Sequence, residues 1–139
     1  MLEIRENCLD KDTYMYLRRQ VGWPTLTDRQ AQCAVNNCLY NVCAYIDGEP
    51  VGMGRVVGDG AVISYVQDLV VLPKAQGQRV GSAILDKLKA YVEGITEPGS
   101  RMMLCLMCAK GREPFYEGHG FVARPTDNLG PGMIMYIEK

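Results

Sequence analysis

The segment from Asp68 to Leu85, DLVVLPKAQGQRVGSAIL, contains groups that could bind an anion. An apolar run ends at Pro73, a polar loop follows, and apolar residues at helical spacing begin at Val80. The first amides of a helix lack partners within it, and the helix dipole adds partial positive charge there. Gly77 and Gly81 carry no side chain that would keep a ligand away from these amides. The segment therefore predicts a phosphate site at a helix start, with a plain loop and helix start as the alternative.

Two common nucleotide-binding motifs do not fit this segment. No Gly-Lys-Ser/Thr follows the loop, as a Walker loop would require. The G-x-G-x-x-G spacing of a dinucleotide site is also absent. We therefore interpret the segment as a phosphate site formed by backbone amides at a helix start, and not as either of these two motifs.

Asp68 is the carboxylate that could take part in chemistry, because it lies in an otherwise apolar strand. Burial would raise the pKa of such a group, and a cationic substrate nearby would lower it. Asp68 could therefore accept a proton, or it could pair with Arg55 or a backbone donor. Gln67 should point to the opposite face of the strand, unless a bulge brings both side chains to one site.

The elements that must position these residues follow from the periodicity of the sequence. The expected helices and strands, in chain order, are helices over 11–19 and 27–38, strands over 40–46, 51–57 and 62–72, a helix over 80–94, a strand over 102–108 that is buried on both faces, a helix over 112–117, a strand beginning at 121 and a last strand over 133–137. Asp47-Gly48 and Asp59-Gly60 predict the turns of a three-stranded antiparallel meander. Gly52 and Gly54 indicate a bulge or a close backbone approach in its middle strand. The pattern predicts an α/β (α+β) fold with a largely antiparallel central sheet flanked by helices, in one domain over residues 1–139.

The helix-start segment resembles the acetyl-CoA-binding motif of the GNAT family of N-acetyltransferases, whose usual form is Gln/Arg-x-x-Gly-x-Gly/Ala. Two registers fit: Gln76, Arg79 and Gly81, or Gln78, Gly81 and Ala83. We favour the first, in which Arg79 replaces one glycine of the motif and its guanidinium could pair with phosphate. A second match is independent of the first, because residues 114–121, PFYEGHGF, resemble the family phrase F-Y-E-x-x-G-F.

The resemblance implies transfer of the acetyl group of acetyl-CoA to a primary amine of a small molecule or a protein. It implies that Asp68 binds the amine or accepts its proton, directly or through water, that the Val70 amide stabilises the oxyanion, and that Tyr116 protonates the leaving thiolate. The residues that it implies for cofactor binding are Leu69, Val70, Val71, Gln76, Gly77, Gln78, Arg79, Val80, Gly81, Ser82, Phe115 and Tyr116. Trp23 and Tyr14 could line the acceptor pocket or belong to the core. A non-catalytic acyl-CoA-binding sensor or interaction module on the same fold is the alternative function.

Composition narrows the possible partners. The 15 basic and 16 acidic residues give a net charge of −1, which argues against a nucleic-acid binder that works by bulk charge. The apolar runs are too short to span a bilayer, so no membrane partner is expected. Charged residues near the N-terminus argue against a signal peptide, which predicts a cytoplasmic location. Dimers are common in the family that the chain resembles, so a homodimer is a possible assembly.

The six cysteines are expected to be free and mostly buried thiols. Cys105 and Cys108 form a C-x-x-C pair, but a zinc site needs further ligands at fitting positions. His119 is the single histidine of the chain. No metal site is therefore expected.

Overall fold

The computed structural model describes all residues, 1–139, and the chain forms two compact units, Met1–Cys105 and Leu106–Lys139. The elements are β1 (Leu2–Glu6), α1 (Lys11–Gln20), α2 (Asp28–Asn37), β2 (Tyr40–Ile46), β3 (Glu49–Gly58), β4 (Ile63–Val71), the 3₁₀ turn η1 (Pro73–Ala75), α3 (Val80–Ile95), β5 (Met103–Leu106) and α4 (Glu113–Glu117). No helix among them combines the length and apolarity needed to cross a membrane. The single domain expected over residues 1–139 stays a prediction.

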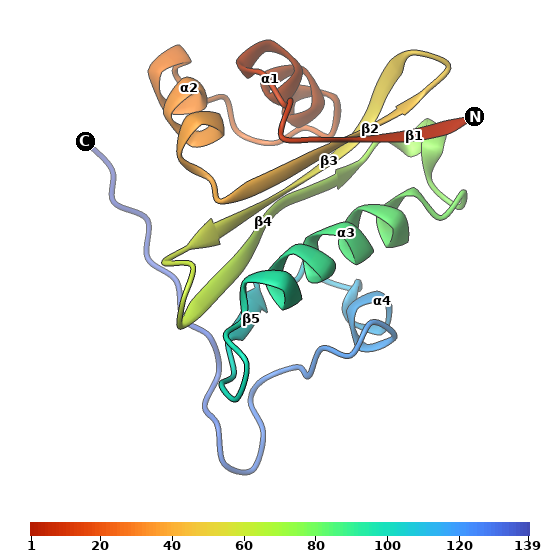
Figure 1. Cartoon of the computed structure of the whole chain (residues 1–139). Helices are drawn as coiled ribbons and strands as arrows, with labels where there is room; N and C mark the ends of the chain where they lie inside the picture. The colour runs from red at the N-terminus through yellow and green to blue at the C-terminus, as the bar shows by residue number, and fades with distance from the viewer. The chain divides into compact units, whose positions relative to one another are not determined.

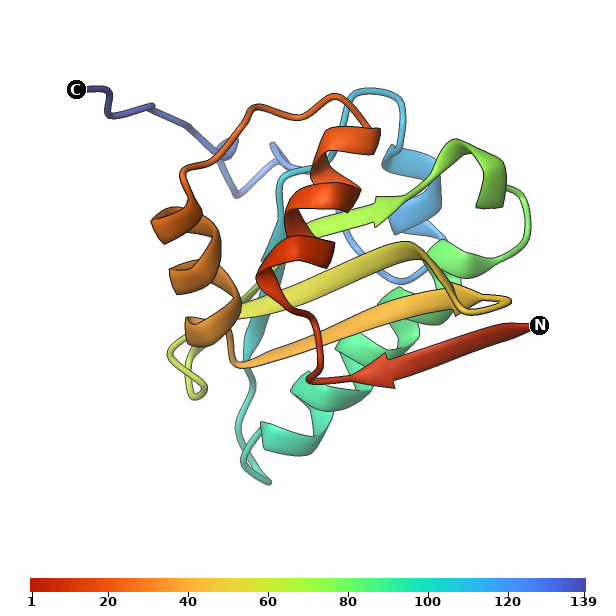
Figure 2. The same cartoon turned by 90° about the horizontal axis from the view of Figure 1, so that it is seen from above.

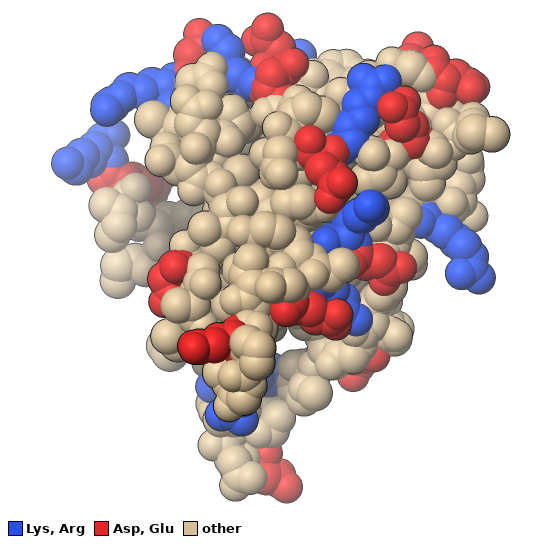
Figure 3. Space-filling view, in the orientation of Figure 1, with Lys and Arg blue, Asp and Glu red and all other residues tan.

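The strands form one sheet in the order β1-β2-β3-β4-β5, in which β1 to β4 pair antiparallel. Helices α1 and α2 cover one face of the sheet and α3 covers the other (Figures 1 and 2). A buried apolar cluster that includes Leu17, Ala31, Met53 and Val70 joins α1 and α2 to the sheet. The predicted α/β class, with a largely antiparallel sheet flanked by helices, is confirmed. Acidic and basic side chains lie interspersed on the face of the molecule shown in Figure 3.

Local sequence signals explain where the two N-terminal helices begin. The Asp10 side chain caps α1 by accepting a hydrogen bond from the Thr13 amide at 2.7 Å. Thr27 caps α2 in a capping box, in which the Gln30 side chain accepts a hydrogen bond from the Thr27 amide at 2.9 Å. Both helices match their predicted ranges within about two residues, as element boundaries usually do.

Two glycines of β3 allow α3 to pack closely on the sheet. A Cβ atom on Gly54 would lie 2.7 Å from Cγ2 of Ile84 and 2.9 Å from a methyl of Leu88. A Cβ on Gly52 would lie 3.0 Å from Cδ1 of Ile84 in α3 and 2.8 Å from the carbonyl oxygen of Val70 in β4. The close backbone approach predicted for these glycines is therefore present, and it holds α3, whose first turn is the expected phosphate site, directly over β3.

Three expectations about strands were wrong. No strand was expected before residue 40, but Leu2–Glu6 forms the edge strand β1 and pairs with β2. The run expected as a strand over 102–108 is the four-residue β5, and it is not buried on both faces because Met103 is 49% exposed. No strand forms at 121 or over 133–137, where most side chains are exposed. Strand-like residues form a strand only where a partner supplies the hydrogen bonds.

The cysteines differ from expectation in their burial. Only Cys43 is buried, whereas Cys8, Cys33 and Cys108 are exposed and Cys38 and Cys105 are partly buried. Burial raises the pKa of the Cys43 thiol to about 11, which keeps it protonated at neutral pH.

Candidate functional site

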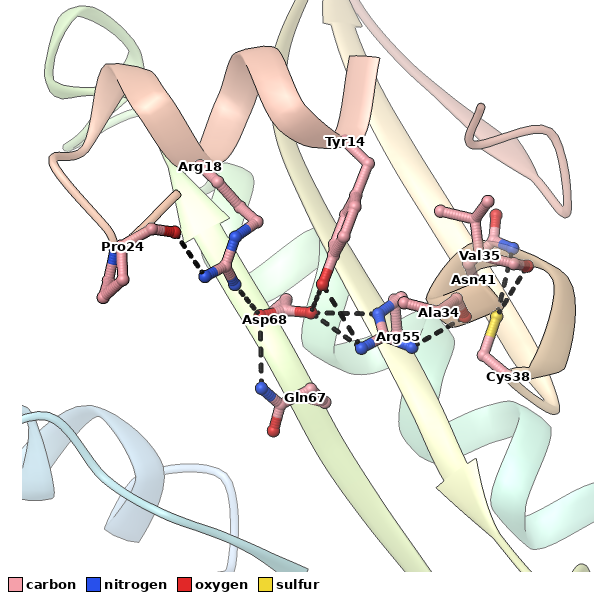
Figure 4. A network of polar contacts seen from close by, with 10 residues as sticks. All are labelled: Tyr14, Arg18, Pro24, Ala34, Val35, Cys38, Asn41, Arg55, Gln67 and Asp68. Carbon is pink, nitrogen blue, oxygen red and sulfur yellow. Dashed lines mark hydrogen bonds and ion pairs between the residues drawn. The ribbon is translucent and has the colours of Figure 1, made fainter. Parts of the chain in front are cut away.

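Strand β4 contains a bulge beside the site. The register of β3 with β4 leaves Gly54 opposite two residues, Asp68 and Leu69. Asp68 adopts a left-handed backbone conformation with φ of 59°, which is uncommon for a residue other than glycine. The bulge brings Gln67 and Asp68 together, and the Gln67 amide nitrogen donates to the Asp68 carboxylate at 3.2 Å (Figure 4). This is the bulge that would allow both side chains to line one site.

The carboxylate of Asp68 is enclosed by donors and has no exposed side-chain surface. Each carboxylate oxygen contacts two residues, whose donors come from α1, β3 and β4. The contacts are Arg18 Nη1 at 2.9 Å and Gln67 Nε2 at 3.2 Å to Oδ1, and Tyr14 Oη at 2.5 Å with Arg55 Nε at 3.0 Å and Nη2 at 2.9 Å to Oδ2. The structure thus shows the ion pair with Arg55 that was the alternative to a proton-accepting role, and that catalytic role stays a prediction.

Tyr14 and the two arginines extend this cluster to neighbouring elements. Burial, followed by the hydrogen bond to Asp68, raises the pKa of Tyr14 to about 12, so Tyr14 keeps its proton and donates it. Arg55 also donates to the carbonyl of Ala34 in α2 at 3.0 Å. Arg18 donates to the carbonyl of Pro24, after α1, at 3.0 Å. One buried cluster therefore joins α1, the α1–α2 loop, α2, β3 and β4 (Figure 4).

A small open cavity of about 130 Å³ lies beside the cluster, between the end of α1 and the loop that follows it. Its lining residues are Met15, Arg18, Arg19, Gly22, Trp23, Pro24, Thr25 and Leu26. The guanidinium of Arg18 lies 5.2 Å from the centre of the Trp23 ring, within cation–π distance. Trp23 thus lines a cavity, whereas Tyr14 is 2% exposed and belongs to the core.

The backbone alternation of β4 decides which amides are open to a ligand. The Leu72 amide donates to the carbonyl of Val51 on the β3 side at 2.8 Å. Because backbone groups alternate in direction along a paired strand, the Val70 amide also points toward β3. The amides of Leu69 and Val71 point away from β3. The carbonyl of Val71 faces that outer side too, where it accepts a hydrogen bond from the Gln76 side chain at 3.1 Å.

Strand β5 lies beside the beginning of β4 and not beside its end. The Met103 amide donates to the carbonyl of Val62 at 3.1 Å, and the Cys105 thiol contacts the carbonyl of Ser64 at 3.8 Å. These contacts advance together along both strands, so β5 runs parallel to β4. Since β5 has only four residues, it ends before the bulge, and the outer edge of β4 at Leu69 and Val71 has no strand partner.

The loop between β4 and α3 directs backbone amides outward. Gly77 and Arg79 have left-handed conformations, with φ of 79° and 62°. The first helical hydrogen bond of α3 runs from the Ala83 amide to the carbonyl of Arg79 at 3.0 Å, so the Val80 and Gly81 amides precede it. This cradle fits a phosphate. A left-handed residue 79 suits the position at which the family motif has glycine, which supports the first register.

The predicted acid, Tyr116, lies in α4 of the second unit. Its ring makes edge contacts with Phe115 and Phe121, with centroids 5.0 and 5.8 Å away. Burial raises the pKa of Tyr116, and the nearby Cys108 adds to the rise. Tyr116 therefore holds its proton at neutral pH, as an acid for a thiolate must. The short helix expected here is confirmed, and the catalytic role stays a prediction.

Comparison with known proteins identifies the family. The sequence profile of the Acetyltransferase (GNAT) domain matches residues 38–123, more than half of the chain. The chain belongs to the GNAT acetyltransferase family. A Staphylococcus aureus structure named as a probable acetyltransferase is 27% identical, with a TM-score of 0.85 over 99% of this chain and 100% of that one. A GNAT family protein from Streptococcus pneumoniae is 25% identical, with a TM-score of 0.84 over the whole of both chains.

A plant enzyme matches part of this GNAT acetyltransferase. Serotonin N-acetyltransferase 2 of rice is 30% identical over 79 residues, which are 54% of this chain and 40% of the rice protein. The chain thus spans less than half the length of this relative. Acetyl transfer to an amine is the activity that the family and its relatives support.

Sequence reasoning missed Arg18 as a site residue and assigned Tyr14 only to a pocket or the core. The two residues are four positions apart in α1 and therefore lie on one helix face. Their spacing was the available signal. Their partner Asp68 is more than 40 residues further along the chain, so nothing local in the sequence connected them.

Proposed function

We propose that the protein transfers the acetyl group of acetyl-CoA to the primary amine of a small molecule. The observation that carries this proposal is the start of α3, which no side chain caps and where the Val80 and Gly81 amides precede the first helical hydrogen bond. It follows the part of β4, at Leu69 and Val71, that the short strand β5 does not reach. The cavity near Trp23 has a volume of about 130 Å³, which leaves room for part of a small acceptor. The rice relative is named for a small amine, serotonin.

The chain offers separate groups for the two ends of the cofactor. The amides from Gly77 to Gly81, with the exposed guanidinium of Arg79, would hold the pyrophosphate, whereas the Gln76 amide already donates to the Pro73 carbonyl at 3.2 Å. The outer edge of β4 at Leu69 and Val71 would pair with the amides of the pantetheine arm, as an added strand would. Phe115 and Tyr116, in the second unit, are assigned to cofactor binding on the family resemblance alone.

The reaction forms a C–N bond and breaks the C–S bond of the thioester, which the acetyl-CoA supplies. The amine must lose a proton to attack, and a base or a water chain must take it. We assign the donor to the thioester oxygen to the Leu69 amide, because the Val70 amide that the family resemblance implied points into the β3–β4 ladder. Tyr116 would give its proton to the departing thiolate.

A non-catalytic acyl-CoA-binding module is the weaker alternative. It requires the same cradle, and it differs from the enzyme in having no turnover. Titration calorimetry with acetyl-CoA measures binding, and a thiol-release assay across a panel of small amines measures turnover. Binding without release of thiol for any amine would favour the module.

Two glutamate substitutions in α3, one at its start and one near its end, test the phosphate cradle. Gly81→Glu places bulk and negative charge among the first amides of α3, and we expect at least a hundredfold loss of acetyl-CoA affinity by calorimetry. Gly94→Glu is the matched control, because Gly94 is exposed near the other end of α3 and a Cβ atom there would have no neighbour within 4 Å. Affinity that survives Gly81→Glu would refute the cradle.

A further inference from the structure

Asp68 combines a left-handed backbone with a carboxylate that is wholly enclosed. Its φ is 59° and its side chain has no exposed surface. A non-glycine residue in this conformation needs surrounding contacts to hold it there. The donors from Tyr14, Arg18, Arg55 and Gln67 supply those contacts.

The enclosed carboxylate is poorly suited to direct proton transfer. An ionised carboxylate has roughly four lone-pair directions, and each oxygen of Asp68 already contacts donors from two residues. An amine or a water could reach Asp68 only by displacing one of these donors. Such a displacement would also leave an arginine charge without its carboxylate partner. Arg18 and Arg55 are nearly buried, with 12% and 8% of their side chains exposed, so water would not replace that partner well.

The cluster instead connects two parts of the proposed site. On one side, Asp68 is the bulge residue that directly precedes Leu69, whose amide faces the open edge of β4. On the other side, Arg18 bonds both Asp68 and the Pro24 carbonyl, and it forms part of the cavity wall beside Trp23. A shift of the carboxylate would therefore move the Leu69 amide and the cavity wall together.

We propose that Asp68 is a positioning residue. Held by Tyr14, Arg18 and Arg55, it fixes the bulge of β4 so that the Leu69 amide is aimed at the reacting oxygen, and it fixes the wall of the acceptor cavity at the same time. This proposal rests on the proposed function. It assigns no proton transfer to Asp68.

The first test removes a single donor and keeps the ring. Tyr14→Phe deletes the hydroxyl that donates to Asp68 at 2.5 Å. Tyr40→Phe is the matched control, because Tyr40 is also buried and its hydroxyl also donates to a carboxylate, that of Glu6, at 2.6 Å. We expect Tyr14→Phe to lower kcat about tenfold, since small misplacements of reacting groups are costly, and to leave the acetyl-CoA Kd within about twofold. Tyr40→Phe should leave kcat within about twofold.

The second test separates positioning from proton transfer. Asp68→Asn keeps the shape and the tolerance of a left-handed backbone, but it removes the charge. Positioning predicts a lower kcat/KM with an unchanged midpoint of its pH dependence. A loss or shift of the acid limb of that profile would show that Asp68 accepts the proton, and it would overturn the proposal.

A third measurement does not depend on turnover. Amide hydrogen exchange at Val70, whose amide points into the β3–β4 ladder directly after the bulge, should be faster in Tyr14→Phe than in wild type, and unchanged in Tyr40→Phe. If wild type transfers no acetyl group, the proposed function fails, and the exchange data alone decide whether the cluster holds the bulge. Equal effects of the two tyrosine substitutions on kcat, or on Val70 exchange, would show that the cluster contributes only general stability, and they would refute the positioning role.

Discussion

The hydrogen bond from Tyr14 to Asp68 predicts a specific loss of stability in alkaline solution. In the folded protein the pKa of Tyr14 is raised from 10.0 to about 12, first by burial and then by Asp68. A group whose pKa is higher in the folded state contributes stability that is complete below pH 10 and is lost as the pH rises toward 12. Each unit of pKa difference corresponds to about 1.4 kcal/mol.

The magnitude follows from this difference. Between pH 9 and pH 11, wild type should lose about 1.4 kcal/mol of unfolding free energy through Tyr14, and about 2.7 kcal/mol in the alkaline limit. The Tyr14→Phe variant has no hydroxyl to ionise and should not show this part of the loss. At neutral pH the same variant should be less stable than wild type by about 1.5–3 kcal/mol, the usual value of a hydrogen bond to a charged group.

Urea unfolding at pH 8, 9, 10 and 11, followed by circular dichroism, measures the difference. Ionisation of lysines and of other tyrosines affects both proteins alike. The informative quantity is therefore the difference in unfolding free energy between wild type and Tyr14→Phe at each pH. This difference in unfolding free energy should become smaller by about 1.4 kcal/mol between pH 9 and pH 11. A difference that stays constant over this range would show that Tyr14 does not donate to a buried carboxylate, and the reasoning about the cluster would fail with it.

Three further substitutions test the rest of the site. Gly54→Ala puts a Cβ 2.7 Å from Ile84 Cγ2, and we expect it to lower the unfolding free energy by about 1–3 kcal/mol; an unchanged urea midpoint would contradict the close packing of α3. Arg79→Gly removes the left-handed strain at φ of 62°, so the unfolding free energy should rise or stay within about 1 kcal/mol of wild type. If the backbone amides bind the phosphate, acetyl-CoA affinity should fall less than tenfold. A larger fall measured by calorimetry would show that the guanidinium is the main phosphate ligand. Tyr116→Phe should lower kcat about a hundredfold with little change in acetyl-CoA Kd; equal turnover would remove Tyr116 from the mechanism.

The helix-start motif and the meander were readable from the sequence because their signals are local. The Asp-Gly turns, the apolar stripe from Val80 and the caps Asp10 and Thr27 depend on residues within a few positions of each other. These elements therefore lie where the sequence predicts them.

The bulge at Asp68 and the direction of the Val70 amide could not be predicted in the same way. A left-handed aspartate inside a strand is stable only when distant groups hold its carboxylate, and Tyr14 and Arg18 come from α1, far away in the sequence. Once the bulge adds a residue to β4, simple alternation from Gln67 no longer gives the facing of the residues beyond it. The strands expected at the C-terminal end were wrong for a related reason, because composition does not supply a pairing partner.

The side chain of Gln76 donates a hydrogen bond to the Val71 carbonyl at 3.1 Å, and this has an energetic consequence for the binding of the proposed co-substrate, acetyl-CoA. In the free protein the Val71 carbonyl already accepts a hydrogen bond from the side-chain amide of Gln76, a group chemically similar to the amides of the pantetheine arm. A ligand that takes this carbonyl exchanges one hydrogen bond for another and gains little net enthalpy there. We therefore expect most of the selectivity for a coenzyme A thioester to come from its phosphate groups. Short acyl thioesters that lack the nucleotide should then be poor acetyl donors.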